Sequence, residues 1–301
     1  MPNVCKLGVY DGNANFGAAT DISYDSYYVS WYPWVSGSVT ALCNNSWANG
    51  RTPIITIRPN INPQVTTAWQ PLYTNLVDDV AAGKYDYAIQ ALCADLRAYN
   101  GPVILRFAPQ MDYLGTAATQ PWVVNPENGA NYAAAYNRFT NVVRIYTNHL
   151  KQLWFMWAPD GRYFVLPYFP IPLDPVKYPN NVMVAGNVDY IGFSLYQYPE
   201  YDLAAYGFVR TFAQMYDALL QRFKLAQKPI IIEMGCGVGT HQTPWTTDAL
   251  AQLQFYANNP PAYSSANLIA AVWYNAPTTD TSWGYQLPAP DFSVTPGLWH
   301  L

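Results

Sequence analysis

Short apolar runs alternate with segments of helical periodicity along most of this chain. Runs of about four to eight residues, rich in Val, Ile, Leu and aromatic side chains, are typical of strands buried on both faces of a parallel sheet. They predict strands at 6–12, 27–33, 53–59, 102–112, 153–160, 188–196, 228–237 and 268–275. Apolar residues that recur every three or four positions predict helices near 38–49, 86–99, 128–150 and 212–223.

Eight strands that alternate with helices indicate the α/β class. We predict one (β/α)8 TIM barrel that spans 1–301 as a single domain, because no linker or short-period repeat divides the chain. The length of 301 residues fits this fold, for which about 250 residues are typical. A doubly wound open sheet is the alternative, but the first strand is not followed by the Gly-rich phosphate loop of such sheets.

The run at 228–237 combines a buried strand with a charged end. Ile230, Ile231 and Ile232 lead directly into Glu233, and Gly235 follows two residues later. In a parallel barrel the carboxyl ends of the strands form the rim at which chemistry takes place. Glu233 therefore either belongs to a site on that rim or merely caps the following turn or pairs with an arginine.

Low charge and many aromatic residues set the composition apart. Charged residues make up 11% of the chain, against roughly 25% in an average soluble domain, while 26 Tyr, 11 Trp and 12 Phe are present. Tyr and Trp offer flat faces with a polar handle, which suit sugar rings as well as an aromatic core. A net charge of -4 without a basic cluster argues against nucleic acid as a partner. No apolar run reaches the ~20 residues of a membrane span.

The cysteines and histidines show no metal-binding spacing. Cys43 and Cys93 fall in helical segments that would be neighbours on a barrel, where they form either a disulfide or two buried thiols. Cys236 is expected to pack near Glu233, and the three His follow no ligand pattern, so we expect no metal and no cofactor. No signal peptide is visible. The protein is then either cytoplasmic or extracytoplasmic with its leader removed. Low charge with many Tyr, Asn and Pro favours a secreted or extracytoplasmic protein, and we expect a monomer.

Polar and aromatic residues follow most of the predicted strands and would converge on one rim. They are Tyr10, Asp11, Trp31, Arg58, Gln110, Asp112, Trp157, Asp160, Tyr196, Glu233 and Trp273. Retaining glycoside hydrolysis needs two carboxyl groups about 5–5.5 Å apart, one as nucleophile and one as acid and then base. The fourth and seventh strands can supply such a pair across a barrel mouth. Glu233 fits the nucleophile, but the fourth strand offers Gln110.

Four stretches follow one known pattern in order and spacing. Residues 105–112 resemble a strand motif that reads Leu-Arg-x-x-His-Glu-Met-Asn, and residues 154–160 resemble Trp-x-x-x-Pro. Residues 185–196 resemble Pro-Gly-x-x-x-Val-Asp-x-x-Gly followed by a Tyr, and residues 228–235 resemble Lys-Pro-x-x-x-x-Glu-x-Gly. Together they make the chain similar to glycoside hydrolases of clan A, specifically family 26, which contains β-mannanases, mixed-linkage glucanases and β-xylanases.

The resemblance implies roles for individual residues. Glu233 would be the nucleophile, Gln110 would stand at the acid/base position, and Tyr196 would hydrogen-bond the nucleophile. Trp157 and Trp273 would form the floor of the sugar subsites. Further substrate contacts are expected from Arg106, Tyr10, Trp31, Asp112 and Asp160, although Trp31 could be a packing residue, Arg106 a structural one and Asp160 a turn residue.

Three positions depart from the family pattern. Pro109 replaces the His that precedes the acid/base residue, Asp112 replaces the Asn two residues beyond it, and Gln110 replaces the Glu itself. Gln110 has three interpretations: an engineered Glu→Gln change, a natural one that leaves a sugar-binding protein, or a site in which Asp112 has taken over the acid role. Because loss of a general acid costs about 10²–10⁴-fold in rate, the chain as written should be impaired but able to bind.

The sequence therefore predicts an endo-acting, retaining β-glycoside hydrolase. Its substrate would be a polysaccharide such as a β-mannan, β-glucan, xylan or bacterial exopolysaccharide, and the sequence does not choose among them. A catalytically silent carbohydrate-binding protein on the same scaffold is the alternative. A barrel enzyme of another kind is disfavoured because no metal ligands, strand-end catalytic Lys or phosphate loop are found.

Overall fold

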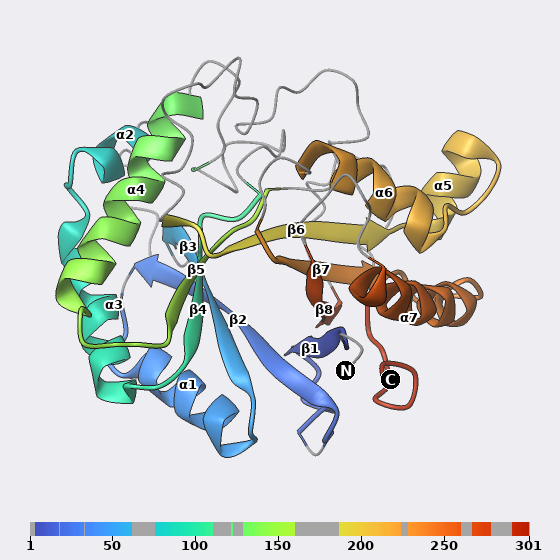
Figure 1. Ribbon diagram of the computed structural model, residues 1–301, viewed down its shortest axis with the longest axis horizontal. Helices are drawn as coiled ribbons and strands as arrows, with labels where there is room; N and C mark the ends of the chain where they lie inside the picture. Colours follow the sequence, from blue (N-terminus) through green and yellow to red (C-terminus); the bar gives the residue numbers. More distant parts are fainter. Residues whose placement is uncertain are drawn as a thin grey trace. The chain divides into compact units, whose positions relative to one another are not determined.

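Eight parallel strands close into a barrel in which they follow one another in sequence order. The computed structural model describes residues 4–17, 19–32, 34–61, 76–110, 122, 129–159, 187–223, 228–259, 267–277 and 291–300. The strands are β1 (Lys6–Asp11), β2 (Ile22–Tyr32), β3 (Thr52–Ile61), β4 (Val103–Phe107), β5 (Leu153–Trp157), β6 (Tyr190–Gln197), β7 (Ile230–Cys236) and β8 (Leu268–Asn275). The predicted (β/α)8 class is thus confirmed (Figure 1).

Helices alternate with these strands. They are α1 (Ser38–Ala48), α2 (Leu76–Ala81), α3 (Asp86–Tyr99), α4 (Gly129–Tyr146), α5 (Pro199–Tyr206), α6 (Phe212–Phe223) and α7 (Gln242–Asn258). The sequence pattern does not predict α2, α5 or α7. In α7 the buried face includes the polar Gln242 and Thr246, which interrupt the apolar periodicity that would reveal a helix. No helix in the described part of the chain has the length and apolar character to cross a membrane.

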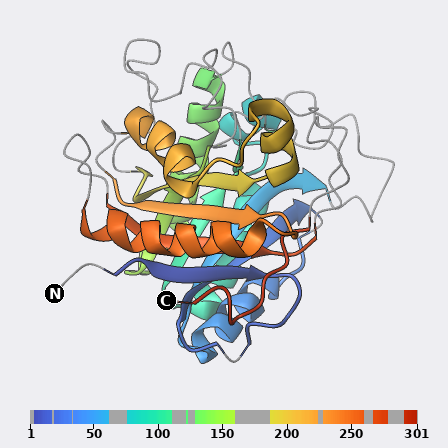
Figure 2. The ribbon, with the colours of Figure 1, turned by 90° about the vertical axis from the view of Figure 1, so that its right-hand side faces the viewer.

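Two compact units can be distinguished along the chain. The first contains β1, the start of β2, and β6 to β8, and these strands pair in the order β6-β7-β8-β1-β2. Helix α7 packs along β7 and β8 (Figure 2). Between helix and strands lies a group of large rings, in which Trp273 contacts Trp245 of α7 and Trp299 near the carboxyl terminus. Trp299 also donates its indole N–H to the carbonyl of Gly8, which ties this last segment to β1.

The second unit contains the rest of β2 and strands β3 to β5, with β3-β4-β5 paired in that order. Helices α1, α3 and α4 lie beside these strands, with α3 in contact with both α1 and α4 (Figure 1). The ring of Phe107 stacks on Phe139 of α4 at 4.3 Å, so strand and helix share one apolar core. Asp95 of α3 accepts hydrogen bonds from the backbone N–H groups of Gly37 and Val39, which caps the start of α1. The single-domain organisation expected from the sequence stays a prediction.

Cys43 and Cys93 settle one alternative left open by the sequence. All four cysteines, Cys5, Cys43, Cys93 and Cys236, are free and buried, so no disulfide joins α1 to α3. Burial raises the pKa of the Cys43 thiol to about 12, and the charge of Asp95 adds to that shift. These thiols behave as small apolar side chains.

Candidate active site

Glu233, the middle residue of β7, is held by a tyrosine from the neighbouring strand. Its carboxylate is buried, with 3% of the residue exposed, and the hydroxyl of Tyr196 donates to Oε1 at 2.5 Å. Tyr196 pairs with Gly235 in the register of β6 and β7, two residues beyond Glu233 and on the same face. A Cβ on Gly235 would lie 3.0 Å from Phe292 and 3.3 Å from Tyr196, so glycine makes room for both rings. The hydrogen bond implied by the family resemblance is therefore present.

An aromatic group continues from Tyr196 to the ends of β8 and β1. Tyr274 lies edge-on to Tyr196 at 6.1 Å and stacks on Tyr10 at 4.8 Å with an angle of 17°. Phe292 contacts both Tyr196 and Tyr274. Tyr10 and Tyr274 are half-buried and lie on the face that carries Glu233. Tyr10 thus lies beside the candidate nucleophile's partner, and Tyr274 is a residue that the sequence reasoning missed.

Trp273 lies on the opposite face of β8 and corrects one expectation. Its indole is fully buried against Trp245 and Trp299 and donates its N–H to the carbonyl of Phe292 at 2.8 Å. Successive side chains of a strand point to opposite faces, so Trp273 faces α7 while Tyr274 faces the side of Tyr196. Trp273 therefore belongs to the core and does not form a subsite floor.

Trp157 and Trp31 are likewise core residues. Trp157 has no exposed surface, and it lies two positions beyond Phe155, whose ring meets Phe139 of α4 edge-on. By strand alternation Trp157 shares that helix-facing side of β5. Trp31, 4% exposed, packs on Tyr85 and on Phe107. Trp157 therefore differs from the expected subsite floor, and Trp31 follows the packing alternative that the sequence left open.

Arg106 occupies the inner side of β4, buried at 3% exposure. Its Nε donates to Oγ1 of Thr56 on β3 at 2.7 Å, and its guanidinium lies 5.1 Å from the ring centroid of Tyr28. The guanidinium of Arg58 lies over the same ring at 4.2 Å. The second unit thus places two cations around one tyrosine, on the face away from its helices.

Gln110 lies in an unusual backbone three residues beyond β4. Both Ala108 and Gln110 have positive φ angles, 46° and 55°, which non-glycine residues rarely adopt. Three hydrogen bonds hold this conformation: Ala108 donates its N–H to Ile57, Gln110 donates its N–H to Ala158 at 2.7 Å, and Trp122 donates its indole N–H to the carbonyl of Pro109. Trp122 is consequently a loop anchor, and the Gln110 side chain is half-exposed at the end of the strand.

Several carboxylates have structural tasks. Asp11 accepts the backbone N–H groups of Asn15 and Phe16, so it is a turn residue. Asp189 accepts the N–H of Phe155 and fastens the start of β6 to β5. Asp112 and Asp160 lie outside the described residues. Among the residues that are described, no three His, Cys, Asp or Glu side chains gather into a metal-binding group.

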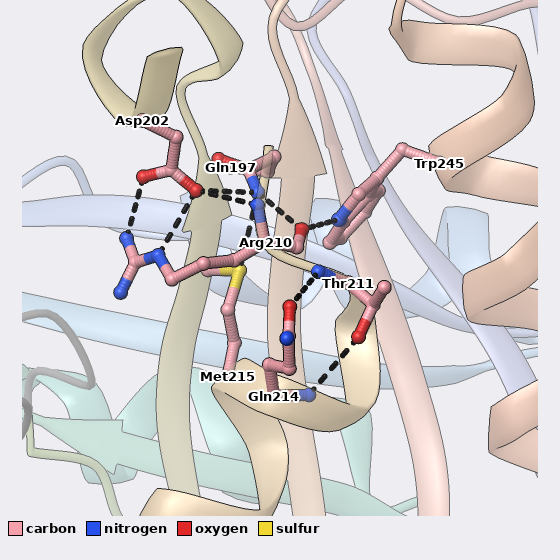
Figure 3. A network of polar contacts seen from close by, with 7 residues as sticks. All are labelled: Gln197, Asp202, Arg210, Thr211, Gln214, Met215 and Trp245. Atoms are coloured by element: carbon pink, nitrogen blue, oxygen red, sulfur yellow. Dashed lines mark hydrogen bonds and ion pairs between the residues drawn. The ribbon is translucent and has the colours of Figure 1, made fainter. Parts of the chain in front are cut away.

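A buried polar network fixes the chain directly after Tyr196. Gln197 donates through Nε2 to Asp202 and to the carbonyl of Arg210, and Arg210 donates to Asp202 from both Nε and Nη2 (Figure 3). Trp245 donates its indole N–H to the same Arg210 carbonyl. Burial alone would lower the pKa of Arg210, but the hydrogen bonds and charge of Asp202 raise it above its ordinary value. The network anchors α5 and α6 to the end of β6.

Comparison with known proteins identifies the fold. No family model and no curated protein matches this sequence. Among solved structures, an endo-β-1,4-mannanase of glycoside hydrolase family 26 from Cellulomonas fimi is similar with 12% identity and a TM-score of 0.54, over 92% of this chain and 66% of that one. Fungal β-1,4-galactanases match with 15% identity and a TM-score of 0.58, over 94% and 86% of the two chains. A family 1 β-glucosidase from Thermotoga maritima matches with 11% identity and a TM-score of 0.61, over 91% and 78%. At these identities the likeness establishes the barrel fold.

Proposed function

We propose that this chain is a retaining β-glycoside hydrolase of the clan A type, similar to family 26, that acts within a polysaccharide. The observation that carries the proposal is the hydrogen bond from Tyr196 to the buried carboxylate of Glu233 within β7. A short hydrogen bond from a hydroxyl to the carboxylate stabilises its ionised form, which is the form that attacks a sugar. The structural neighbours, which include a mannanase, galactanases and a β-glucosidase, support the same reaction class.

Glu233 has the role of nucleophile in this proposal. It would form a covalent glycosyl intermediate that water then hydrolyses. The hydroxyl of Tyr196, which donates to Oε1, would hold the carboxylate in place. The half-buried pair of Tyr10 and Tyr274 supplies ring surface for a sugar beside it. This aromatic pair takes the place that the sequence assigned to Trp273. An extracytoplasmic location and a monomeric state fit a polysaccharide substrate.

By the family resemblance, Gln110 would be the residue at the acid/base position. An amide donates hydrogen bonds but gives up no proton to a leaving group. The chain as written would then bind its substrate and cleave it slowly, whether the Gln is engineered or natural. A second candidate function, a silent carbohydrate-binding protein, is favoured by this Gln alone. Asp112 would be the acid in the third interpretation.

The proposal is tested by restoring the missing acid. The Gln110→Glu variant should hydrolyse at least one member of a panel of β-mannan, β-glucan, xylan and bacterial exopolysaccharides, roughly 10²–10⁴-fold faster than the unchanged chain. The matched control is Gln110→Glu combined with Glu233→Gln, which keeps the restored acid and should be inactive. If the restored variant folds and cleaves nothing on the panel, the hydrolase proposal fails and the binding protein remains.

A second assay uses the chain as it stands. A 2,4-dinitrophenyl β-glycoside loses its leaving group without help from an acid, so Gln110 should not block the first step. Mass spectrometry of the protein after brief incubation should show a glycosyl adduct on Glu233. An adduct on another residue would contradict the assignment of the nucleophile.

A further inference from the structure

We propose that Arg58, with Arg106 behind it, binds the carboxylate of an acidic sugar, so that the substrate of this protein is a polysaccharide that contains uronic acids. The inference rests on the proposed glycoside hydrolase function and narrows its substrate class. It is carried by the two guanidinium groups that share the ring of Tyr28 in the second unit.

The position of Arg58 on β3 directs it to the inner side of the sheet. Thr56 pairs with Arg106 in the register of β3 and β4, and Arg106 bonds to Thr56, so both side chains lie on one face. Arg58 follows Thr56 by two residues and therefore lies on the same face, one step nearer the carboxyl end of the strand. In parallel barrels substrates bind at that end.

Burial separates the roles of the two arginines. Arg106 is buried and donates Nε to Thr56, which fixes its guanidinium. Arg58 is half-buried, and its guanidinium carbon lies over Tyr28 at 4.2 Å from the ring centroid. Contact through the planar face leaves the N–H groups at the edge of a guanidinium available to oxygen acceptors. The stacked ring thus holds Arg58 ready for a ligand without using its donors.

The charge of the site selects an anion. Both guanidinium groups carry a positive charge, and both attract an anion that binds at the edge of Arg58. Arg58 takes part in none of the ion pairs found within the described part of the chain, such as that of Arg210 with Asp202. A planar carboxylate matches the fork of an arginine in a two-bond arrangement, which the hydroxymethyl group of a neutral hexose does not.

Binding measurements on the chain with Gln110 test this directly, because turnover is slow. Isothermal titration calorimetry would compare β-1,4-linked tetramannuronate with β-1,4-mannotetraose, and β-1,4-linked tetraglucuronate with cellotetraose. Within each pair only the C6 group differs. We expect at least one acidic member to bind roughly 10- to 100-fold more tightly than its neutral counterpart, as a charged hydrogen-bonded pair allows. That preference should shrink as salt is raised.

Variants assign the preference to Arg58. Arg58→Gln should bring the acidic ligand to the affinity of the neutral one, while Arg58→Lys should keep part of the preference because the charge remains. Arg144→Gln is the matched control: Arg144 also lies over an aromatic ring, that of Phe155 at 5.0 Å, but it is an exposed residue of α4. It should leave both affinities unchanged.

Each remaining outcome contradicts a different statement. Equal affinity for acidic and neutral ligands, or a preference that survives Arg58→Gln in a folded variant, overturns the inference and leaves the hydrolase proposal standing. A preference for sulfated over both carboxylated and neutral ligands replaces the uronic acid with a sulfate ester. If no oligosaccharide binds and the Gln110→Glu variant cleaves nothing, both the inference and the proposed function fall.

Discussion

Replacing Asp202 by alanine should lower the free energy of unfolding by about 3–5 kcal/mol, because a largely buried cation would lose its partner. Asp202 has no exposed surface and accepts hydrogen bonds from the backbone N–H, Nε and Nη2 of Arg210 at 2.8–2.9 Å, and from Nε2 of Gln197 at 3.0 Å. The Arg210 side chain keeps 19% exposure, so water would solvate part of the orphaned charge. We therefore expect the lower half of that range.

The assay is urea unfolding followed by tryptophan fluorescence, with the change taken from the midpoint at constant slope. Asp86→Ala is the matched control, since Asp86 pairs with Arg138 at the surface, where the two side chains are 23% and 44% exposed. It should cost less than about 1 kcal/mol. Combining Asp202→Ala with Arg210→Met should recover part of the loss, because the buried charge is then gone. A cost for Asp202→Ala no greater than that of Asp86→Ala would refute the reasoning.

Three further outcomes follow from the same structure. In the acid/base-restored protein, Tyr196→Phe should reduce kcat by roughly 10- to 100-fold through loss of a hydrogen bond to the charged Glu233, with little change in the urea midpoint. Gly235→Ala should cost about 1–3 kcal/mol in urea unfolding, because its Cβ would meet Phe292 at 3.0 Å; an unchanged midpoint would show that the ring yields freely. Cys43 should make the free energy of unfolding fall as pH rises from about 9 to about 12, because the unfolded thiol ionises at its ordinary pKa of 9.0 whereas the folded one stays protonated to about 12. Cys43→Ala should reduce that fall in pH-dependent unfolding.

The barrel could be predicted from the sequence because its strands are short, apolar and regularly spaced. β8 was placed at its observed bounds, and the predicted 86–99 helix coincides with α3. β2 begins at Ile22, five residues before the predicted start at 27, since Asp25 and Ser26 are polar residues buried within it. Buried polar residues interrupt the apolar pattern on which strand and helix prediction depends.

The faces on which strand residues lie could not be predicted from the sequence. A slip of one position moves a side chain to the other side of a sheet, and this is the error at Trp273, where Tyr274 faces the site. The register that fixes the face, with Met234 opposite Trp273, is a property of the pairing between β7 and β8. The presence of Trp in the sequence also did not distinguish core residues from sugar-binding ones, because an indole packs in a core as readily as it stacks on a sugar.

The backbone after β4 offers a way to distinguish an impaired hydrolase from a carbohydrate-binding protein as the explanation of Gln110. Two residues with positive φ, Ala108 and Gln110, flank Pro109, and each such backbone costs on the order of 1–3 kcal/mol unless its surroundings hold it. Here Trp122 and the carbonyl of Ala158 hold it with hydrogen bonds of 2.7 Å each. Backbone strain of this kind is found where a side chain must point in one direction. A Gln amide and a Glu carboxyl group have nearly the same shape, and they differ in their charge and in their ability to transfer a proton. Gln110→Glu should therefore enter this backbone without a change in the urea midpoint. A loss of about 1 kcal/mol or more would mean that the strand end is built for an amide, which favours the carbohydrate-binding protein over the impaired hydrolase.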